Sequence, residues 1–196
     1  MLKFTHGVMG AAKSAHALIQ KYNYSDNGYK VLLIKSSLDT RDPKCVKSRA
    51  GNLSCECDVF DENADLCVLF YKWVRNIKLP KNKIIVMVDE AQFCTKEQIN
   101  QLRLIANDYN VFCYGLKMDF KLNLFEGSKR LLELSDEVEE IKHMCKHCGQ
   151  KANINAIYVD DKLVTNGETI ITNYDNYKAL CYKCYTKELK KFLDLM

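Results

Sequence analysis

Apolar runs and amphipathic segments alternate along the first 140 residues of this chain. Short apolar runs at residues 2–5, 29–35, 83–88 and 111–115 have the length and the β-branched content of buried strands. Between them, apolar residues recur every three or four positions, as in helices that bury one face. Because strands buried on both faces are typical of parallel sheets, this alternation predicts an α/β fold with a parallel sheet flanked by helices.

The ends of the predicted helices carry capping signals. The first helix is expected at about residues 13–22, and a second carries the apolar positions of residues 66–74, with Asp61 or Asn63 as its N-cap. Residues 95–98 have the form of a capping box and begin a third helix. The third helix is expected to end at Asn110. A short helix over 128–134 and a weakly alternating strand over 138–143 are expected to follow.

The last part of the chain, residues 141–196, has a different pattern. Two β-like runs, 156–159 and 168–171, are separated by the turn dipeptide Asn166–Gly167. An amphipathic helix follows from Lys183. We therefore expect two units, an α/β domain over residues 1–140 and a small β module with a helix over the remainder.

The composition is that of a globular protein, and it limits the kinds of partner that the protein is expected to bind. Apolar residues make up 47% of the chain and charged residues 28%, which supports an ordinary packed core. The net charge of +4 is mild and suits an anionic small ligand, without calling for nucleic acid. No apolar run is long enough to span a bilayer and the N-terminus lacks a signal-peptide pattern, so we expect a cytoplasmic protein with no membrane partner.

Four of the ten cysteines form two C-x-x-C pairs, Cys145 with Cys148 and Cys181 with Cys184. Two thiolates from each of two turns give the closed tetrahedral set that structural zinc prefers. His147 could replace one cysteine as a ligand. A redox pair and a zinc ribbon that binds nucleic acid are competing interpretations; the presence of two pairs argues against the first, and the lack of arginine clusters argues against the second. The other six are expected to be free thiols: Cys45, Cys55, Cys57, Cys67, Cys94 and Cys113.

A candidate phosphate loop lies between the first strand and the first helix. It has the frame G-x-x-x-x-G-K-[ST], with Ala12 at the second glycine position. Backbone N–H groups of such loops surround phosphates, while Lys13 would reach the β- and γ-phosphates and Ser14 would coordinate Mg²⁺. If the loop needs a positive φ at Ala12, that angle costs on the order of 1 kcal/mol. The candidate phosphate-binding residues are Gly7, Val8, Met9, Gly10, Ala11, Ala12, Lys13 and Ser14.

An acidic pair, Asp89–Glu90, follows the apolar run 84–88 directly. Ligands of open α/β sheets bind at the carboxyl ends of the strands. Two carboxylates there suit the tasks of holding a phosphate-bound metal and taking a proton. A solvated turn without chemistry is the alternative.

Together these motifs resemble the zinc-containing type II thymidine kinases, in the right order and over nearly the whole chain. The matching segments are the loop at 7–14, Asp39-Thr40-Arg41, Ser48-Arg49-Ala50-Gly51, Asp89-Glu90-Ala91-Gln92-Phe93, Tyr114-Gly115-Leu116 with Asp119-Phe120 and Leu124-Phe125, the two cysteine pairs, and Asp175-Asn176-Tyr177. The chain departs from the family pattern at Ala12 and at Thr172–Asn173, where the family usually has two glycines in a "lasso" loop.

The resemblance implies a P-loop NTPase-like domain, a zinc-binding module with a lasso loop, and transfer of the γ-phosphoryl group of ATP to the 5′-hydroxyl of thymidine. Glu90 would be the general base, Arg41 would stabilise charge on the phosphoryl group, and Asp89 would act on Mg²⁺ through water. Feedback inhibition by dTTP and a homotetramer are also implied. The implied thymidine-binding residues are Phe93, Leu116, Met118, Phe120, Phe125, Ile170, Thr172 and Tyr177.

The two departures leave a second hypothesis, a nucleotide-binding regulatory relative without catalysis. Retention of Lys13, Ser14, Arg41, Asp89 and Glu90 favours the working enzyme.

Overall fold

The predicted parallel sheet is present. The structure is a computed structural model that describes residues 1–42, 44–167 and 176–193. Six strands form one sheet in the order β5-β2-β6-β7-β1-β8, and all the pairings between them are parallel. Their bounds are β1 Leu2–His6, β2 Lys30–Ser36, β5 Asp58–Phe60, β6 Ile84–Asp89, β7 Asn110–Gly115 and β8 Glu137–Glu140.

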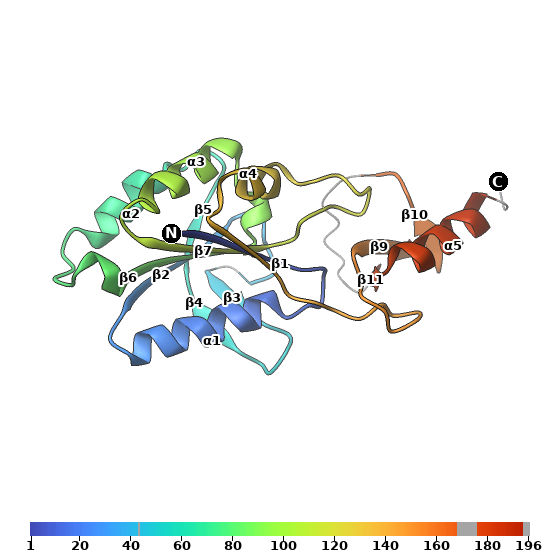
Figure 1. Ribbon diagram of the computed structural model, residues 1–196, viewed down its shortest axis with the longest axis horizontal. Coiled ribbons are helices and arrows are strands. Elements are labelled where there is room, and N and C mark those ends of the chain that lie inside the picture. Colours follow the sequence, from blue (N-terminus) through green and yellow to red (C-terminus); the bar gives the residue numbers. More distant parts are fainter. Residues whose placement is uncertain (43, 168–175, 194–196) are drawn as a thin grey trace.

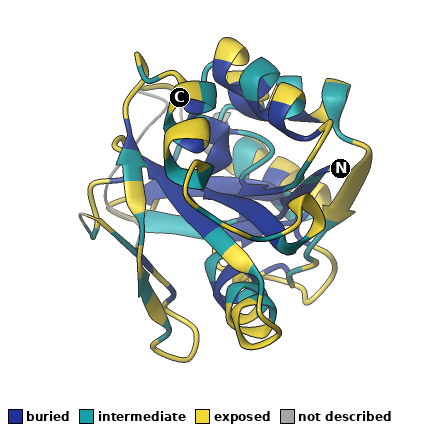
Figure 2. Ribbon diagram, turned by 90° about the vertical axis from the view of Figure 1, so that its left-hand side faces the viewer, coloured by how far each residue is buried: buried dark blue, intermediate teal, exposed yellow. Residues whose placement is uncertain are grey.

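Helices cover both faces of this sheet (Figure 1). On one face lie α2 (Leu66–Val74), α3 (Lys96–Ile105) and α4 (Glu126–Leu134). On the other lies α1 (Lys13–Asp26), together with a hairpin of β3 (Cys45–Lys47) and β4 (Ser54–Glu56). Figure 2 shows the central strands buried between these layers, so the mixed α/β class is confirmed.

The central strand β6 shows why its apolar run forms a buried strand. All six of its residues are buried. Ile84, Val86 and Val88 belong to the core under α2 and α3, while Ile85 and Met87 belong to the core under α1. Because successive side chains of a strand point to opposite faces, an unbroken apolar run supplies both cores. Each such side chain stabilises the fold by about 1.5–3 kcal/mol relative to exposure.

Several predicted helix boundaries are wrong. The N-cap of α2 is Asp65, whose side chain accepts the Val68 N–H, and neither Asp61 nor Asn63 has this role. The capping box of Thr95 and Gln98 is confirmed at α3. That helix ends at Ile105, and Asn110 is instead the first residue of β7.

Other elements are longer or shorter than predicted. Helix α1 continues to Asp26, and α4 begins at Glu126, two residues before the predicted start. The edge strand β8 begins at Glu137 and ends at Glu140, three residues before the predicted end.

The last part of the chain forms a three-stranded antiparallel sheet and a helix. The sheet has the order β10-β9-β11, with β9 at Ile154–Val159, β10 at Lys162–Val164 and β11 at Tyr177–Leu180; α5 follows at Tyr182–Leu193. The β9–β10 turn, which was not predicted, is Asp160–Asp161, both with positive φ, and Asn166–Gly167 lies after β10. Short acidic side chains tolerate this left-handed angle better than most. The second predicted run, 168–171, lies outside the described residues.

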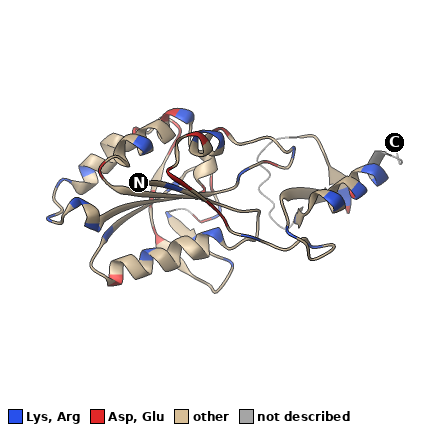
Figure 3. Cartoon of the chain, in the orientation of Figure 1, with Lys and Arg blue, Asp and Glu red and all other residues tan. Residues whose placement is uncertain are grey.

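Charged residues are spread over both parts of the molecule (Figure 3). Lys and Arg occur along the helices of the sheet domain and along α5, while three glutamates occupy the short edge strand β8. Among the helices in the described ranges, none has the length and the apolar character needed to cross a membrane.

Candidate active site and metal centre

A cleft opens at the carboxyl ends of the parallel strands. It is lined by segments that follow β1, β2, β6 and β7, and by the tip of the β3–β4 hairpin. The lining residues are Met9, Gly10, Ala12, Lys13, Ser14, Arg41, Lys47, Ser48, Arg49, Ala50, Glu90, Gln92, Phe93, Leu116, Phe125 and Tyr177. Thus the structure brings together most of the residues that the motifs singled out.

The candidate phosphate loop adopts the backbone angles that its frame demands. Ala12 has φ 58° and ψ 30°, in the left-handed region, and it directly precedes α1. Gly10 has a φ of +81°. A left-handed alanine costs about 1–2 kcal/mol, so the chain holds this angle against a real steric penalty.

Lys13 is buried at the centre of the loop. Its Nζ donates to the carbonyl oxygens of Gly7 and Val8, both at 3.1 Å. Burial lowers its pKa, while the charges of Glu90 and Asp89 act in the opposite direction. The loop therefore holds a cationic group next to two carboxylates at one end of the cleft.

Asp89 connects β6 to the phosphate loop. The Ser14 hydroxyl donates to Asp89 Oδ2 at 2.8 Å, although β7 lies between β1 and β6 in the sheet. Burial and the neighbouring Glu90 charge raise the pKa of Asp89 to about 7. A hydroxyl and a carboxylate oxygen this close together are ligands of the kind that Mg²⁺ prefers.

Glu90 is held from both sides. Arg41 Nη2 donates to Glu90 Oε1, and Gln92 Nε2 donates to Glu90 Oε2 at 2.6 Å. Glu90 itself has a φ of 51°, a strained left-handed angle of the kind that gathers at functional sites. Its carboxylate thus has a fixed position at the edge of the cleft.

Arg41 is fixed in turn by Asp39. The Arg41 Nε donates to Asp39 Oδ1 at 2.6 Å, and the fully buried Lys35 donates to Asp39 Oδ2 at 3.2 Å. Burial opposes ionisation of Asp39, but the hydrogen bond and charge of Arg41 hold its pKa below the usual value. A line of alternating charges therefore runs from Lys35 on β2 through Asp39 and Arg41 to Glu90.

Gln92 belongs to the motif of residues 89–93, but the sequence predicts no role for it. It is 2% exposed, and its Oε1 accepts the Leu116 N–H at 2.9 Å. A Cβ at Gly115 would lie 2.6 Å from this Oε1, so glycine at the end of β7 makes room for the amide. Gln92 therefore links the carboxylate of Glu90 to the segment that follows β7.

The hairpin tip supplies a second group that sequence reasoning left without a role. Lys47, Ser48, Arg49 and Ala50 line the cleft. The only sequence signal for them is the cationic Ser48-Arg49 motif, because the flanking three-residue strands have no clear apolar period.

The apolar side of the cleft contains part of the expected thymidine pocket. The rings of Phe93 and Phe125 meet edge-to-face with centroids 6.0 Å apart, and Leu116 and Tyr177 also line the cleft. Phe120 is fully buried and, like Met118, does not line it. Gly7, Val8, Ala11 and Asp89, which were predicted to bind phosphate, are also buried and do not line the cleft. Ile170 and Thr172, with Asn173, lie outside the described residues.

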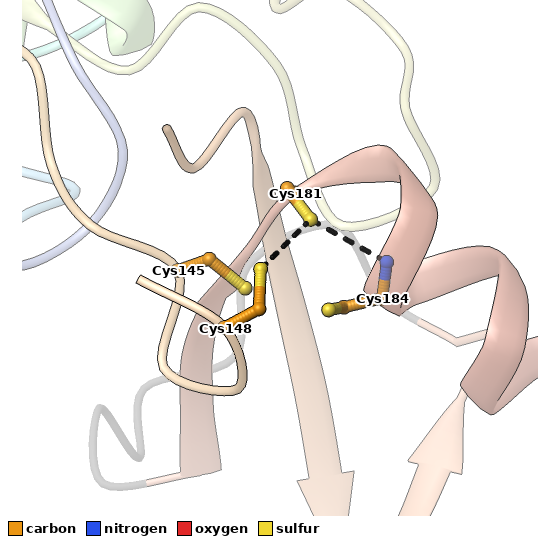
Figure 4. Close-up of side chains that lie close together, drawn as sticks. All are labelled: Cys145, Cys148, Cys181 and Cys184. Carbon is orange, nitrogen blue, oxygen red and sulfur yellow. Dashed lines mark hydrogen bonds between the residues drawn. The ribbon is translucent and has the colours of Figure 1, made fainter. Parts of the chain in front are cut away.

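Four cysteine sulfurs gather beside β11 and α5 (Figure 4). The sulfurs of Cys145, Cys148, Cys181 and Cys184 all lie within 4.8 Å of one another, and those of Cys148 and Cys181 are 3.6 Å apart. Zinc–sulfur bonds of about 2.3 Å in a tetrahedron place sulfurs about 3.8 Å apart, so the group could hold a metal such as zinc. His147 is not part of this group.

The thiol of Cys145 is prepared to act as a thiolate. Burial opposes its ionisation, but backbone N–H groups of Cys181, His147 and Cys148 point at the sulfur and lower its pKa to about 6. Thiolates are the form that binds metals. The six cysteines outside the cluster are free thiols, as predicted.

The fold and the site define a class, an α/β enzyme that transfers a phosphoryl group at the carboxyl edge of a parallel sheet. Over residues 1–185 the sequence matches the family profile described as "Thymidine kinase". It is 41% identical over 194 residues to the thymidine kinase of Enterobacteria phage T4, covering 97% of each chain. It is 38% identical to that of Lactococcus lactis subsp. lactis (95% of this chain, 97% of the relative) and 37% identical to that of Zymomonas mobilis subsp. mobilis (96% and 97%). The chain belongs to the thymidine kinase family, and phosphorylation of thymidine is its reaction.

Proposed function

We propose that this kinase takes the γ-phosphoryl group of ATP, with Mg²⁺, and transfers it to the 5′-hydroxyl of thymidine to give dTMP. One observation carries the proposal. The Glu90 carboxylate is clamped by Arg41 and Gln92 in a cleft that is lined both by the phosphate loop and by the paired rings of Phe93 and Phe125.

On the phosphate side, the loop from Gly7 to Ser14 would surround the phosphates with N–H groups at the start of α1. Lys13 would bind the β- and γ-phosphates. Ser14 and Asp89, joined at 2.8 Å, would hold Mg²⁺ directly or through water.

On the nucleoside side, Phe93, Leu116, Phe125 and Tyr177 would enclose the thymine and the sugar. Glu90 would take the proton of the 5′-hydroxyl, and Arg41 would stabilise charge on the phosphoryl group in flight. Met118 and Phe120 would support this pocket from behind. Ile170 and Thr172 would complete it.

We further propose that the four cysteines bind structural Zn²⁺, and that residues 1–140 form the kinase domain and 141–196 the metal-binding module. The tetrahedral spacing of the sulfurs supports the zinc assignment. Feedback inhibition by dTTP and a homotetramer are proposed from the family resemblance. Exposed Ile19 and Tyr22 on α1 offer an apolar surface for contact between copies.

The test is Glu90→Gln, which keeps the size of the side chain but removes the base. We expect thymidine turnover with ATP and Mg²⁺ to fall by about 10²–10⁴-fold, the contribution typical of a positioned general base. ATP affinity, measured by calorimetry, should stay within about twofold because the phosphate loop is intact.

Glu62→Gln, at an exposed glutamate before α2, is the matched control and should leave turnover unchanged. Normal turnover in Glu90→Gln would remove Glu90 from the role of base. ATP binding without turnover in the wild type would instead indicate a non-catalytic relative.

A further inference from the structure

The phosphate loop is built against the metal-binding module. Val8 and Ala11 are buried in the same apolar cluster as Cys145, Ile154 and Cys181. Ile141 packs against the same cluster, and a Cβ at Gly7 would lie 2.8 Å from its carbonyl oxygen. Residues between the sheet and β9 therefore pack directly on the loop that is proposed to bind ATP.

Asn155, the second residue of β9, makes the most direct link. It is 5% exposed, and its Oδ1 accepts the Met9 N–H at 2.7 Å. Its Nδ2 donates to the Met118 carbonyl oxygen at 3.2 Å. Because one end of the amide accepts and the other donates, its orientation is fixed, and it joins the loop, β9 and the segment after β7.

The contact with Met9 falls where the loop needs support. Phosphate loops bind through backbone N–H groups whose directions are set before the ligand arrives. Here the loop also contains the left-handed Ala12, and a strained angle persists only when the surroundings fix it. Asn155 fixes the peptide plane at Met9, between Gly7 and Gly10. Without it, the part-buried N–H of Met9 would lose the partner that the structure gives it.

We propose that Asn155 is a positioning residue for the phosphate donor, and that through it ATP affinity and metal retention in the four-cysteine cluster depend on each other. The inference rests on the proposed function of the loop as the ATP site. Coupling between two binding sites is reciprocal, so a metal that favours the ATP-binding loop must be held more firmly when ATP is bound.

The first experiment compares steady-state kinetics of the full chain with those of Asn155→Ala and Asn155→Leu. We expect the KM for ATP to rise about tenfold, the effect of losing about 1.4 kcal/mol, which is the order of magnitude of one lost hydrogen bond. The kcat and the KM for thymidine should stay within about twofold, because Asn155 contacts the nucleoside side only through the backbone carbonyl oxygen of Met118, which does not line the cleft, whereas Met9 does. Leucine nearly preserves the side-chain volume, so it tests the contact if the alanine variant fails to fold.

Asn153→Ala is the matched control, since Asn153 precedes β9 and is half-buried. It should leave both KM values unchanged. An unchanged KM for ATP in the Asn155 variants, or an equal rise in both KM values, would show that Asn155 only supports the fold.

The second experiment follows Zn²⁺ release from the zinc-loaded protein to a coloured chelator. Saturating Mg-ATP should slow release severalfold in the wild type, and this protection should largely disappear in Asn155→Leu. Release that is insensitive to Mg-ATP would overturn the coupling. A wild type with no affinity for ATP would overturn the proposed function as well, whereas variants that bind ATP as well as the wild type would overturn this inference alone.

Discussion

Two residues of the cleft, Ala12 and Glu90, have left-handed backbone angles although neither is glycine. Each such angle costs about 1–2 kcal/mol. Both lie next to the groups proposed to act on phosphate or on the nucleoside. At these two positions the strain falls where the directions of N–H groups and of one carboxylate matter.

Ala12→Gly tests this strain directly. Glycine relieves about 1–2 kcal/mol of steric cost in the folded state. It also raises the conformational entropy of the unfolded chain, which favours unfolding by about 0.4–1 kcal/mol, so we expect a net stabilisation of up to about 1 kcal/mol. Urea unfolding measures the difference, and turnover should be retained.

Ala106→Gly is the control, because Ala106 has an ordinary φ of −69°. That variant should be destabilised by about 1 kcal/mol or more, since the residue is buried beside α3. Equal destabilisation of the two variants would mean that the angle at Ala12 carries no strain.

Asp89 should make stability fall as pH rises. Its pKa is raised from 3.8 to about 7 in the folded chain, so between these values the folded state binds more protons than the unfolded state. Stability from this group is therefore greatest at low pH and is lost toward pH 7. Asp89→Asn should be more stable than the wild type by on the order of 1–3 kcal/mol above pH 7, with the gain shrinking toward pH 4.

Urea unfolding at pH 7.5 and pH 4.5 checks the sign, and thymidine turnover should be lost in the same variant. A variant less stable than the wild type at pH 7.5 would show that burial of this carboxylate is fully compensated.

At the scale of elements, α4 presses on the short helix η2 (Ala91–Phe93) that follows Glu90. Gly127 allows this contact, because a Cβ there would lie 2.6 Å from the Cys94 carbonyl oxygen and 2.7 Å from that of Ala91. Both are backbone atoms, which cannot move aside cheaply. Gly127→Ala should therefore destabilise the fold by about 1–3 kcal/mol and lower kcat by shifting the support of Glu90.

Chemical denaturation and kinetics on the same preparation test this. Lys129→Ala, at an exposed position of the same helix, should change stability by no more than about 0.5 kcal/mol. Wild-type stability of the Gly127 variant would mean that α4 can shift freely.

The same elements show what the sequence could reveal. The long apolar runs of β6 and β7 and the capping box of α3 are local signals, and they correctly predicted the strands and the helix start. Strands β3 and β4 have three residues each and little buried surface, so hydrophobic periodicity does not predict them. Asp61, Asn63 and Asp65 are all residue types that cap helices, so the sequence alone does not distinguish them, and the structure has Asp65 as the cap.

The candidate site, too, could be predicted only where its residues form a local pattern in the sequence. Motifs identified Lys13, Asp89 and Glu90, because their chemistry requires fixed spacing along the chain. Gln92 and Asn155 act through partners 24 and 146 residues away, Leu116 and Met9, and such contacts leave no local pattern.

For the whole molecule, the cysteine cluster should decide whether the C-terminal module holds its shape. That module has one small apolar core, and structural zinc supplies folding free energy to such units. Cys148→Ser should lose bound zinc, lower the melting temperature and abolish turnover. Metal analysis and calorimetry check the first two effects.

Cys67→Ser, at a half-buried free thiol on α2, is the control and should keep both the metal and the activity. Full zinc content in the Cys148 variant would exclude that sulfur as a ligand.

The ion pair between Arg41 and Glu90 bears on the hydrolysis of ATP by water, a side reaction open to a kinase. In the structure, the base and the cation satisfy each other, and Asp39 anchors the arginine from behind. If Glu90 is the base, as proposed, an acceptor hydroxyl would have to compete with Arg41 for its carboxylate before giving up a proton. Thymidine can draw on contacts with Phe93 and Phe125 to do so, whereas a water molecule gains nothing from an aromatic surface. With Glu90 as the proposed base and ATP as the proposed donor, the resting pair would discriminate against water as an acceptor and would protect ATP from hydrolysis while the nucleoside pocket is empty.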